Sequence, residues 1–186
     1  MGLCLITGGA ASGKSEYAEN MAVSMTMQDN ETHKLFYIAS MYPYDEESRD
    51  RIKRHRMMRE GREFETVECY TGVSSLNDRV IDDSVVLFEC MSNLLANEIY
   101  LKDGALKSED EEELQKSIDG CIIKPFVSLS ARTCLLIITN DVFADGNVYD
   151  HETERYIRLL DHVNRQLAKH ADHVIRVVCS IPVSVK

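Results

Sequence analysis

The chain has 186 residues, of which 44% are hydrophobic and 28% are charged, and its formal net charge at pH 7 is -10. This composition is typical of one globular domain that buries its core without disulfides or structural metals. The negative charge argues against binding to nucleic acid or to an anionic membrane surface, because their phosphate groups repel an acidic protein.

The chain also lacks the sequence features of membrane and disulfide-rich proteins. No apolar run approaches the roughly 20 residues that a membrane-spanning helix requires. The six cysteines are scattered singly and form no C-x-x-C pair that would indicate a zinc or redox site. The first residues lead into an apolar run without a charged leader segment. We therefore expect a cytoplasmic protein with no membrane span and with free thiols.

Apolar runs and helical spacings alternate along the chain. A short strand is predicted over 3–7, a glycine-rich loop follows, and from Ser15 apolar residues recur at helical spacing. Further strands are predicted over 35–39, 85–88, 134–138 and 174–178, and helices over 46–58, from about 91, from 109 and over 152–170. Ser108 and Glu111 are expected to form a capping box for the helix from 109. Surface turns are expected at 29–32, 101–104 and 145–147.

This alternation indicates the fold class. Near-continuous apolar strands are typical of parallel sheets that helices cover on both faces. The pattern therefore predicts a single α/β domain over 1–186 with a mostly parallel, doubly wound sheet. In such a sheet, ligands bind beyond the carboxyl ends of the strands. The residues at those positions are Gly8, Ser40, Glu89, Thr139 and Asn140.

Residues 8–15 read Gly-Gly-Ala-Ala-Ser-Gly-Lys-Ser and match the phosphate-binding pattern G-x-x-x-x-G-K-[ST]. Gly8 and Gly13 allow backbone N–H groups to turn inward around a phosphate, and the next helix points its positive end at it. Lys14 is expected to reach the β and γ phosphates of a nucleotide, and Ser15 to hold magnesium. The predicted loop residues of this nucleotide site are Gly8, Gly9, Ala10, Ala11, Ser12, Gly13, Lys14 and Ser15.

Glu89 follows the apolar strand over 85–88. An acidic residue at this position can hold magnesium or orient an attacking hydroxyl in phosphoryl transfer. A solvated carboxylate is the alternative, because acidic residues at strand ends also serve solubility. We predict that Ser15 and Glu89 form the metal site.

A basic segment stands out in the acidic chain. Seven of its 21 basic residues fall between positions 49 and 62, namely Arg49, Arg51, Lys53, Arg54, Arg56, Arg59 and Arg62. A solvated helix face is one interpretation, and a second phosphate-binding surface beside the loop is the other. His55 is the only histidine inside this cluster, and neutral imidazole is a competent nucleophile near neutral pH.

The motifs occur in an ordered set that extends over nearly the whole chain. Its parts are 6–15, 37–40, 45–46, Arg-Ile-Lys-Arg-His-Arg at 51–56, 64–68, 87–90 with Asn97, 139–142, 163–168 and 181–186. The ordered set is more specific than any one of these motifs. This set resembles the bifunctional adenosylcobinamide kinase/adenosylcobinamide-phosphate guanylyltransferase family. The resemblance implies a RecA-like P-loop fold that assembles as a homotrimer, with the histidine helix near the phosphate loop.

The resemblance also implies two reactions. A nucleoside triphosphate, ATP or GTP, phosphorylates the corrinoid adenosylcobinamide with magnesium as cofactor, and GMP then passes from GTP to that phosphate through a guanylylated histidine. By position this histidine is His55, and the implied catalytic residues are His55, Lys14 and Glu89. Beyond the loop, the expected nucleotide contacts are Ser40, Arg51, Arg54, Arg59, Arg62 and Glu68.

The chain departs from the family pattern at several positions. Where the family has Asn-Glu-Val-Gly, residues 140–143 read Asn-Asp-Val-Phe, and the turn that follows at 146–149 reads Gly-Asn-Val-Tyr. Asp161 takes the place of a glycine, and Phe64 that of a tryptophan. These departures raise the expectation of altered corrinoid or guanine contacts, while the phosphate loop and His55 are intact.

Two other functions compete with this interpretation. An ordinary P-loop small-molecule kinase needs only the phosphate loop and would leave His55 incidental, but the basic run around His55 argues against it. A nucleotide-dependent regulatory protein without catalysis is suggested by the divergent segment 140–149. The presence of a complete set of candidate catalytic groups argues for an enzyme.

Overall fold

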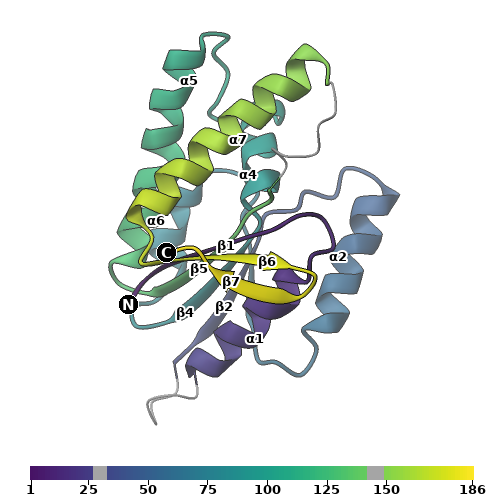
Figure 1. Ribbon diagram of the computed structural model, residues 1–186, viewed down its shortest axis with the longest axis vertical. Helices are drawn as coiled ribbons and strands as arrows, with labels where there is room; N and C mark the ends of the chain where they lie inside the picture. Colours follow the sequence, from purple (N-terminus) through teal and green to yellow (C-terminus); the bar gives the residue numbers. More distant parts are fainter. Residues whose placement is uncertain (27–32, 142–148) are drawn as a thin grey trace.

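A seven-stranded sheet forms the middle of the computed structural model, which describes residues 1–26, 33–141 and 149–186 (Figure 1). The strands are β1 (Gly2–Thr7), β2 (Leu35–Ala39), β3 (Glu65–Glu68), β4 (Val85–Glu89), β5 (Cys134–Ile138), β6 (His173–Val178) and β7 (Ile181–Ser184). Their order across the sheet is β3-β2-β4-β5-β1-β6-β7. All neighbouring pairs are parallel except β6 and β7, which are antiparallel.

Helices cover both faces of this sheet. They are α1 (Lys14–Thr26), α2 (Glu46–Met58), α3 (Leu76–Arg79), α4 (Met91–Tyr100), α5 (Glu111–Ile118), α6 (Lys124–Ser130) and α7 (His151–His170). Figure 1 shows α1 and α2 on one face and α4 to α7 on the other. No helix in these described ranges is long and apolar enough to cross a membrane.

The strand side chains explain why both faces are covered. Successive side chains of a strand point to opposite faces of its sheet. Leu3 and Leu5 therefore join the core under α4 to α7, whereas Cys4 and Ile6 pack in the core formed with α1. This arrangement confirms the predicted α/β class with a mostly parallel sheet.

The structure differs from the sequence prediction in two edge strands that were not predicted and in one predicted helix that is divided. The strand β3 reads Glu-Thr-Val-Glu, and only Val67 in it is buried. The strand β7 is exposed along its length and contains Pro182, which edge strands tolerate. The helix expected from 109 is divided into α5, a π-helical turn over Asp119–Ile123 and α6. An apolar run detects a buried strand, but an edge strand is recognised only through its neighbour in the sheet.

The start of α5 corrects the predicted capping box. The N-cap is Asp110, whose side chain accepts a hydrogen bond from Glu113 N at 2.9 Å. Ser108 Oγ instead donates to the Glu113 side chain at 2.6 Å. The expected pair of Ser108 and Glu111 was therefore wrong, because the carboxylate of Asp110 reaches the first free N–H groups of the helix.

Of the expected surface turns, the one at 101–104 is present and is closed by a hydrogen bond from Gly104 N to Leu101 O at 3.0 Å. The turns expected at 29–32 and 145–147 lie outside the described residues.

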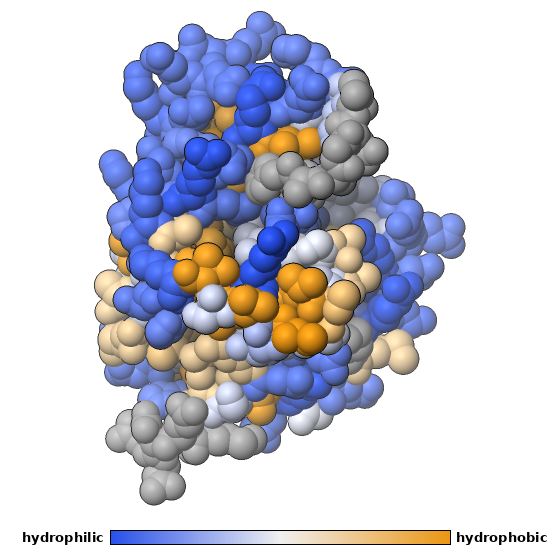
Figure 2. All heavy atoms as spheres, viewed as in Figure 1, coloured by the Kyte–Doolittle hydropathy of each residue, from blue (hydrophilic) through white to orange (hydrophobic). Residues whose placement is uncertain are grey.

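The hairpin of β6 and β7 carries an exposed hydrophobic face at the edge of the sheet. The side chains of this face are Val178, Ile181, Val183 and Val185, which are 47% to 65% exposed. Figure 2 shows hydrophobic side chains gathered where Figure 1 places this hairpin. We call these four residues the hairpin face. An exposed apolar edge strand of this kind is suited to contact with another chain.

Asn97 on α4 connects two loops at the carboxyl ends of the strands. Its side chain is almost fully buried and donates from Nδ2 to Ser40 O at 2.8 Å and to Tyr70 O at 2.9 Å. Its Oδ1 accepts a hydrogen bond from Tyr44 Oη at 3.0 Å. One amide therefore satisfies polar groups from both loops.

Asn97→Ala is expected to lower the free energy of unfolding by about 2 to 4 kcal/mol, because two buried carbonyl groups lose their donors. Urea denaturation measures this change. Asn77→Ala is the matched control, because Asn77 is exposed and its truncation should change stability by less than about 0.5 kcal/mol. Equal losses in the two variants would contradict the bridging role of Asn97.

Candidate functional site

The glycine-rich loop over 8–13 joins the end of β1 to the start of α1. A Cβ atom at Gly8 would lie 2.5 Å from Ser12 Oγ and 2.6 Å from Val177 O, so only glycine fits there. Gly13 has a φ angle of 89°, a backbone conformation that strains other residues. The tight packing and the backbone therefore require both glycines of the motif.

A cavity of about 750 Å³ opens beside this loop, and this volume is ordinary for a small-molecule site. Its walls come from the loop, α1, α2, β3 and the end of β4. Besides Ser15, the lining includes histidine and charged residues, namely Lys14, Arg49, Arg51, Lys53, His55, Arg56, Arg59, Glu68 and Glu89. The fold thus brings the phosphate loop and the basic helix to one cavity.

Lys14 is the first residue of α1, and only 8% of its surface is exposed. Its Nζ donates a hydrogen bond to Gly9 O at 2.9 Å. Burial lowers the pKa of Lys14, and the nearby carboxylate of Glu89 partly offsets this effect. A cation in such a poorly hydrated position interacts more strongly with a phosphate than one in bulk water.

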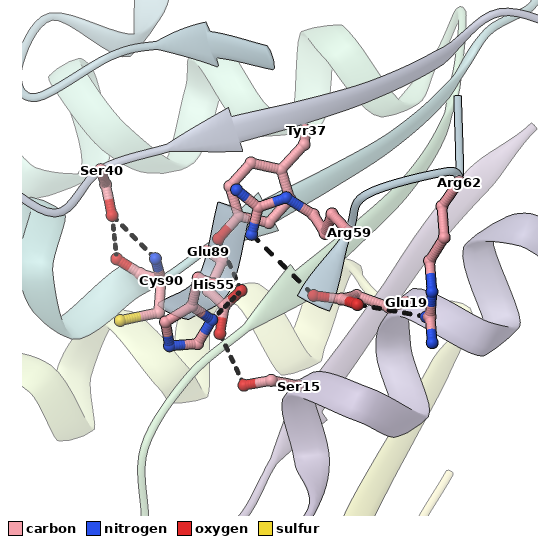
Figure 3. Close-up of polar contacts among 9 residues, drawn as sticks. All are labelled: Ser15, Glu19, Tyr37, Ser40, His55, Arg59, Arg62, Glu89 and Cys90. Carbon is pink, nitrogen blue, oxygen red and sulfur yellow. Dashed lines mark hydrogen bonds and ion pairs between the residues drawn. The ribbon is translucent and has the colours of Figure 1, made fainter. Parts of the chain in front are cut away.

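Glu89 lies at the end of β4 and contacts three other elements (Figure 3). Its Oε1 accepts a hydrogen bond from Ser15 Oγ at 2.5 Å, and its Oε2 accepts one from Tyr37 Oη at 2.7 Å. The same Oε2 lies 3.8 Å from His55 Nδ1. Burial raises the pKa of Tyr37 well above its usual range, so its phenol stays protonated as a donor.

His55 lies in the last turn of α2 and faces Glu89 through Nδ1. One quarter of its side chain is exposed, and Nδ1 itself is buried without a hydrogen-bond partner among the described residues. This orientation leaves Nε2 as the ring nitrogen that points away from Glu89. A nucleophilic histidine needs one free nitrogen and a group that orients the other.

Glu19 on α1 is a buried acidic residue that the sequence motifs did not single out. It is fully buried, and it lies 3.1 Å from Arg62 Nη1 through Oε2 and 3.9 Å from Arg59 Nη1 through Oε1. The guanidinium of Arg59 lies 3.3 Å above the ring of Tyr37. The sequence contained one signal that Glu19 is buried, because this residue falls between Ala18 and Ala22 on the apolar side of the helix.

Of the six nucleotide contacts predicted beyond the loop, three lie outside the described lining of the cavity. Ser40 is fully buried, and its hydroxyl exchanges hydrogen bonds with the backbone of Cys90 at 2.7 and 2.8 Å. Arg62 is turned toward Glu19 and Asn20. Arg54 is exposed on α2. These three side chains do not line the cavity beside the phosphate loop.

Two sets of residues could hold a metal ion. Ser15 Oγ and Glu89 Oε1 are hard oxygen donors beside the phosphate loop, which is the donor chemistry that magnesium prefers. Glu19, His55 and Glu89 also bring ligand atoms within 4.8 Å of one another. Glu19 already forms ion pairs with Arg59 and Arg62. Ser15 and Glu89 therefore form the better site for magnesium.

The described departures from the family pattern are accommodated locally. Asp161 forms an ion pair with Arg165 at 2.7 Å on α7. Phe64 contacts the ring of Tyr37 edge to face, with centroids 6.0 Å apart. Asp141, which stands where the family has a glutamate, forms an ion pair with Arg176 at 2.5 Å. The divergent residues 142–148 lie outside the described residues.

The site has the features of a P-loop protein of the nucleotide-binding class. A glycine-rich loop joins the first strand to the first helix, a lysine and a serine begin that helix, and a carboxylate ends β4. Residues 4–185 also match the family described as cobinamide kinase / cobinamide phosphate guanyltransferase. The chain therefore belongs to this family of transferase enzymes, and the resemblance predicted from its motifs is confirmed.

Relatives of the chain match along its whole length. It is 29% identical to the bifunctional adenosylcobalamin biosynthesis protein CobU of Salmonella typhimurium and 32% identical to the protein of the same name in Escherichia coli. Each match spans 191 residues and covers 99% of both chains. A solved KaiC-like protein from Pyrococcus horikoshii is 13% identical, with a TM-score of 0.48 over 94% of this chain and 70% of that chain.

Lys14→Ala is expected to reduce phosphoryl transfer from a nucleoside triphosphate by about a hundredfold or more, because the transferred charge loses its cation. The melting temperature should not fall at pH 7. Burial lowers the pKa of Lys14, so the charged amine costs folding free energy at every pH below its usual range, and its removal ends that cost. Steady-state kinetics and thermal unfolding measure the two effects.

Lys102→Ala is the control for Lys14, because Lys102 is exposed in the turn after α4. This variant should keep parent activity. A folded Lys14→Ala variant with parent activity would overturn the role of Lys14.

Proposed function

We propose that this chain phosphorylates adenosylcobinamide with ATP or GTP and then transfers GMP from GTP to adenosylcobinamide phosphate through His55. The product is adenosylcobinamide-GDP. Membership of the cobinamide kinase / cobinamide phosphate guanyltransferase family supports the pair of reactions. The observation that carries the proposal is the position of His55 in the same cavity as Lys14 and Ser15, 3.8 Å from the carboxylate that contacts Ser15.

In the first reaction, the backbone of the loop and the start of α1 bind the phosphates of the nucleotide. Lys14 stabilises the charge that develops on the transferred phosphoryl group. Ser15 and Glu89 would hold magnesium, which shields the phosphate charge when bound. The hydroxyl oxygen of adenosylcobinamide attacks the γ-phosphorus and its proton passes to solvent. The bond from that phosphorus to the bridging oxygen breaks, and the nucleoside diphosphate leaves.

In the second reaction, Nε2 of His55 attacks the α-phosphorus of GTP. A nitrogen–phosphorus bond forms, the bond from that phosphorus to the bridging oxygen breaks, and pyrophosphate leaves. A phosphate oxygen of adenosylcobinamide phosphate then attacks the same phosphorus and releases the histidine. Arg49, Arg51 and Lys53 line the cavity and would offset the charge on the phosphate oxygens, while Glu89 orients the ring through Nδ1.

We also propose a cytoplasmic location and a homotrimeric assembly. All six cysteines are free thiols, which suits a reducing compartment. The hairpin face offers an apolar surface for contact between copies, and the number of three subunits comes from the family resemblance.

Multi-angle light scattering is expected to give the mass of three chains for the parent protein. Ile181→Lys should shift the mass toward one chain, because it places a charge on the hairpin face. Ile81→Lys is the matched control, since Ile81 is also exposed but lies outside the hairpin. A monomeric parent, or an unchanged mass for Ile181→Lys, would contradict this proposal.

The parent protein is expected to become covalently labelled when it is incubated with α-labelled GTP and magnesium, and intact-mass spectrometry measures the added GMP. A nitrogen–phosphorus bond is labile in acid and more stable in alkali. His55→Asn should abolish the label and the GMP transfer, while phosphorylation of adenosylcobinamide stays within about threefold of the parent rate.

His170→Asn is the control for His55, because His170 is exposed at the end of α7. It should label like the parent. An unlabelled parent that still phosphorylates adenosylcobinamide would favour a monofunctional kinase, and loss of both reactions in the parent would favour a regulatory nucleotide-binding protein.

A further inference from the structure

Glu19 occupies an unusual position between the helix of the phosphate loop and the helix of the histidine. It lies on α1, five residues after Lys14, and none of its surface is exposed. Its partners, Arg59 and Arg62, come from the segment that directly follows α2. Figure 3 shows the two arginines reaching Glu19 from different sides, with Arg59 on the side of Tyr37.

Stability alone is a poor explanation for this buried carboxylate. Removing an acidic side chain from water costs several kcal/mol, and ion pairs in such places often recover no more than that cost. Burial raises the pKa of Glu19, Glu89 raises it further, and Arg59 and Arg62 act in the opposite direction. Its Oε1 has no hydrogen-bond partner among the described residues. The position therefore calls for a role beyond packing.

A continuous set of contacts leads from Glu19 to His55. Arg59 lies beside Glu19 and stacks on Tyr37, whose hydroxyl donates to Glu89 Oε2 at 2.7 Å. Arg59 is also the C-cap of α2, four residues after His55. Side chains four residues apart lie on the same side of a helix, so a fixed Arg59 also fixes the position of His55.

We propose that Glu19 is a positioning residue for the guanylylation of His55. Its ion pairs with Arg59 and Arg62 hold the end of α2 against α1, and this contact keeps His55 at Glu89 and over the nucleotide. The inference rests on the proposed role of His55 as the GMP acceptor. It gives the two helices of the site a defined link, since α1 binds the nucleotide and α2 supplies the nucleophile.

Glu19→Gln tests the inference, because glutamine keeps the size of the side chain and removes its charge. The rate of labelling from saturating α-labelled GTP should fall by about tenfold or more, while the KM for GTP changes by less than about threefold. Phosphorylation of adenosylcobinamide should stay within about threefold of the parent rate, because the contacts of Lys14 and Ser15 do not involve Glu19.

Two further variants separate positioning from folding. Glu16→Gln is the matched control, since Glu16 lies one turn earlier on α1 and is exposed, and it should label at the parent rate. Arg62→Gln should also slow labelling, because Arg62 holds Glu19 at 3.1 Å. The double variant Glu19→Gln/Arg62→Gln should be no slower than Glu19→Gln alone, as expected when two residues act through one contact.

The outcomes distinguish this inference from the proposed function. A parent protein without label overturns the role of His55 and the positioning role with it. A labelled parent and a Glu19→Gln variant that labels at the parent rate overturn the positioning role alone. Equal losses of labelling and kinase activity together with a lower melting temperature would show that Glu19 only supports the fold. If Glu19→Gln does not fold, Arg62→Gln decides the question by the same comparison.

Discussion

The carboxylate of Glu89 is the point where the separate parts of the site meet. It accepts hydrogen bonds from Ser15 on α1 and from Tyr37 on β2, and it lies beside His55 from α2. These contacts depend on the register of the sheet, in which Glu89 pairs with Ala39 of β2 and with Ile138 of β5. A shift of one residue along β4 would turn this side chain to the opposite face. The parallel alignment of the strands therefore determines whether the site exists.

The charge around the cavity opposes the charge of the whole chain. The net charge of -10 repels polyanions at long range, whereas the basic residues of α2 other than Arg54 line the cavity beside the phosphate loop. Lys14 and Arg59 are both less than 10% exposed, and buried cations act on a bound phosphate with little screening by water. Such cations also need fixed partners. Arg59 has the ring of Tyr37 and the carboxylate of Glu19, and these partners hold it in the wall of the cavity.

Local sequence was sufficient to predict the parts of the protein that depend on a short stretch of chain. The buried strands appear as apolar runs. Residues 8–15 specify the phosphate loop because the glycines that shape its backbone and the lysine that follows them are neighbours in the sequence. The basic segment with His55 could also be predicted, because its charged residues lie close together in the sequence. The family could also be predicted from an ordered set of such motifs, and the match over 4–185 confirms it.

Tertiary structure alone decided which side chains from distant segments face one another. The link from Glu19 to Arg59 and Arg62 spans about 40 residues of chain. The bridge from Asn97 to Ser40 and Tyr70, and the edge strands β3 and β7, depend equally on partners that no local pattern specifies. Ser40 and Arg62, which were predicted to contact the nucleotide, form hydrogen bonds with Cys90 and with Glu19. An ion pair or a buried hydrogen bond is specified by the packing of two elements, whereas a loop or a strand is specified by the residues within it.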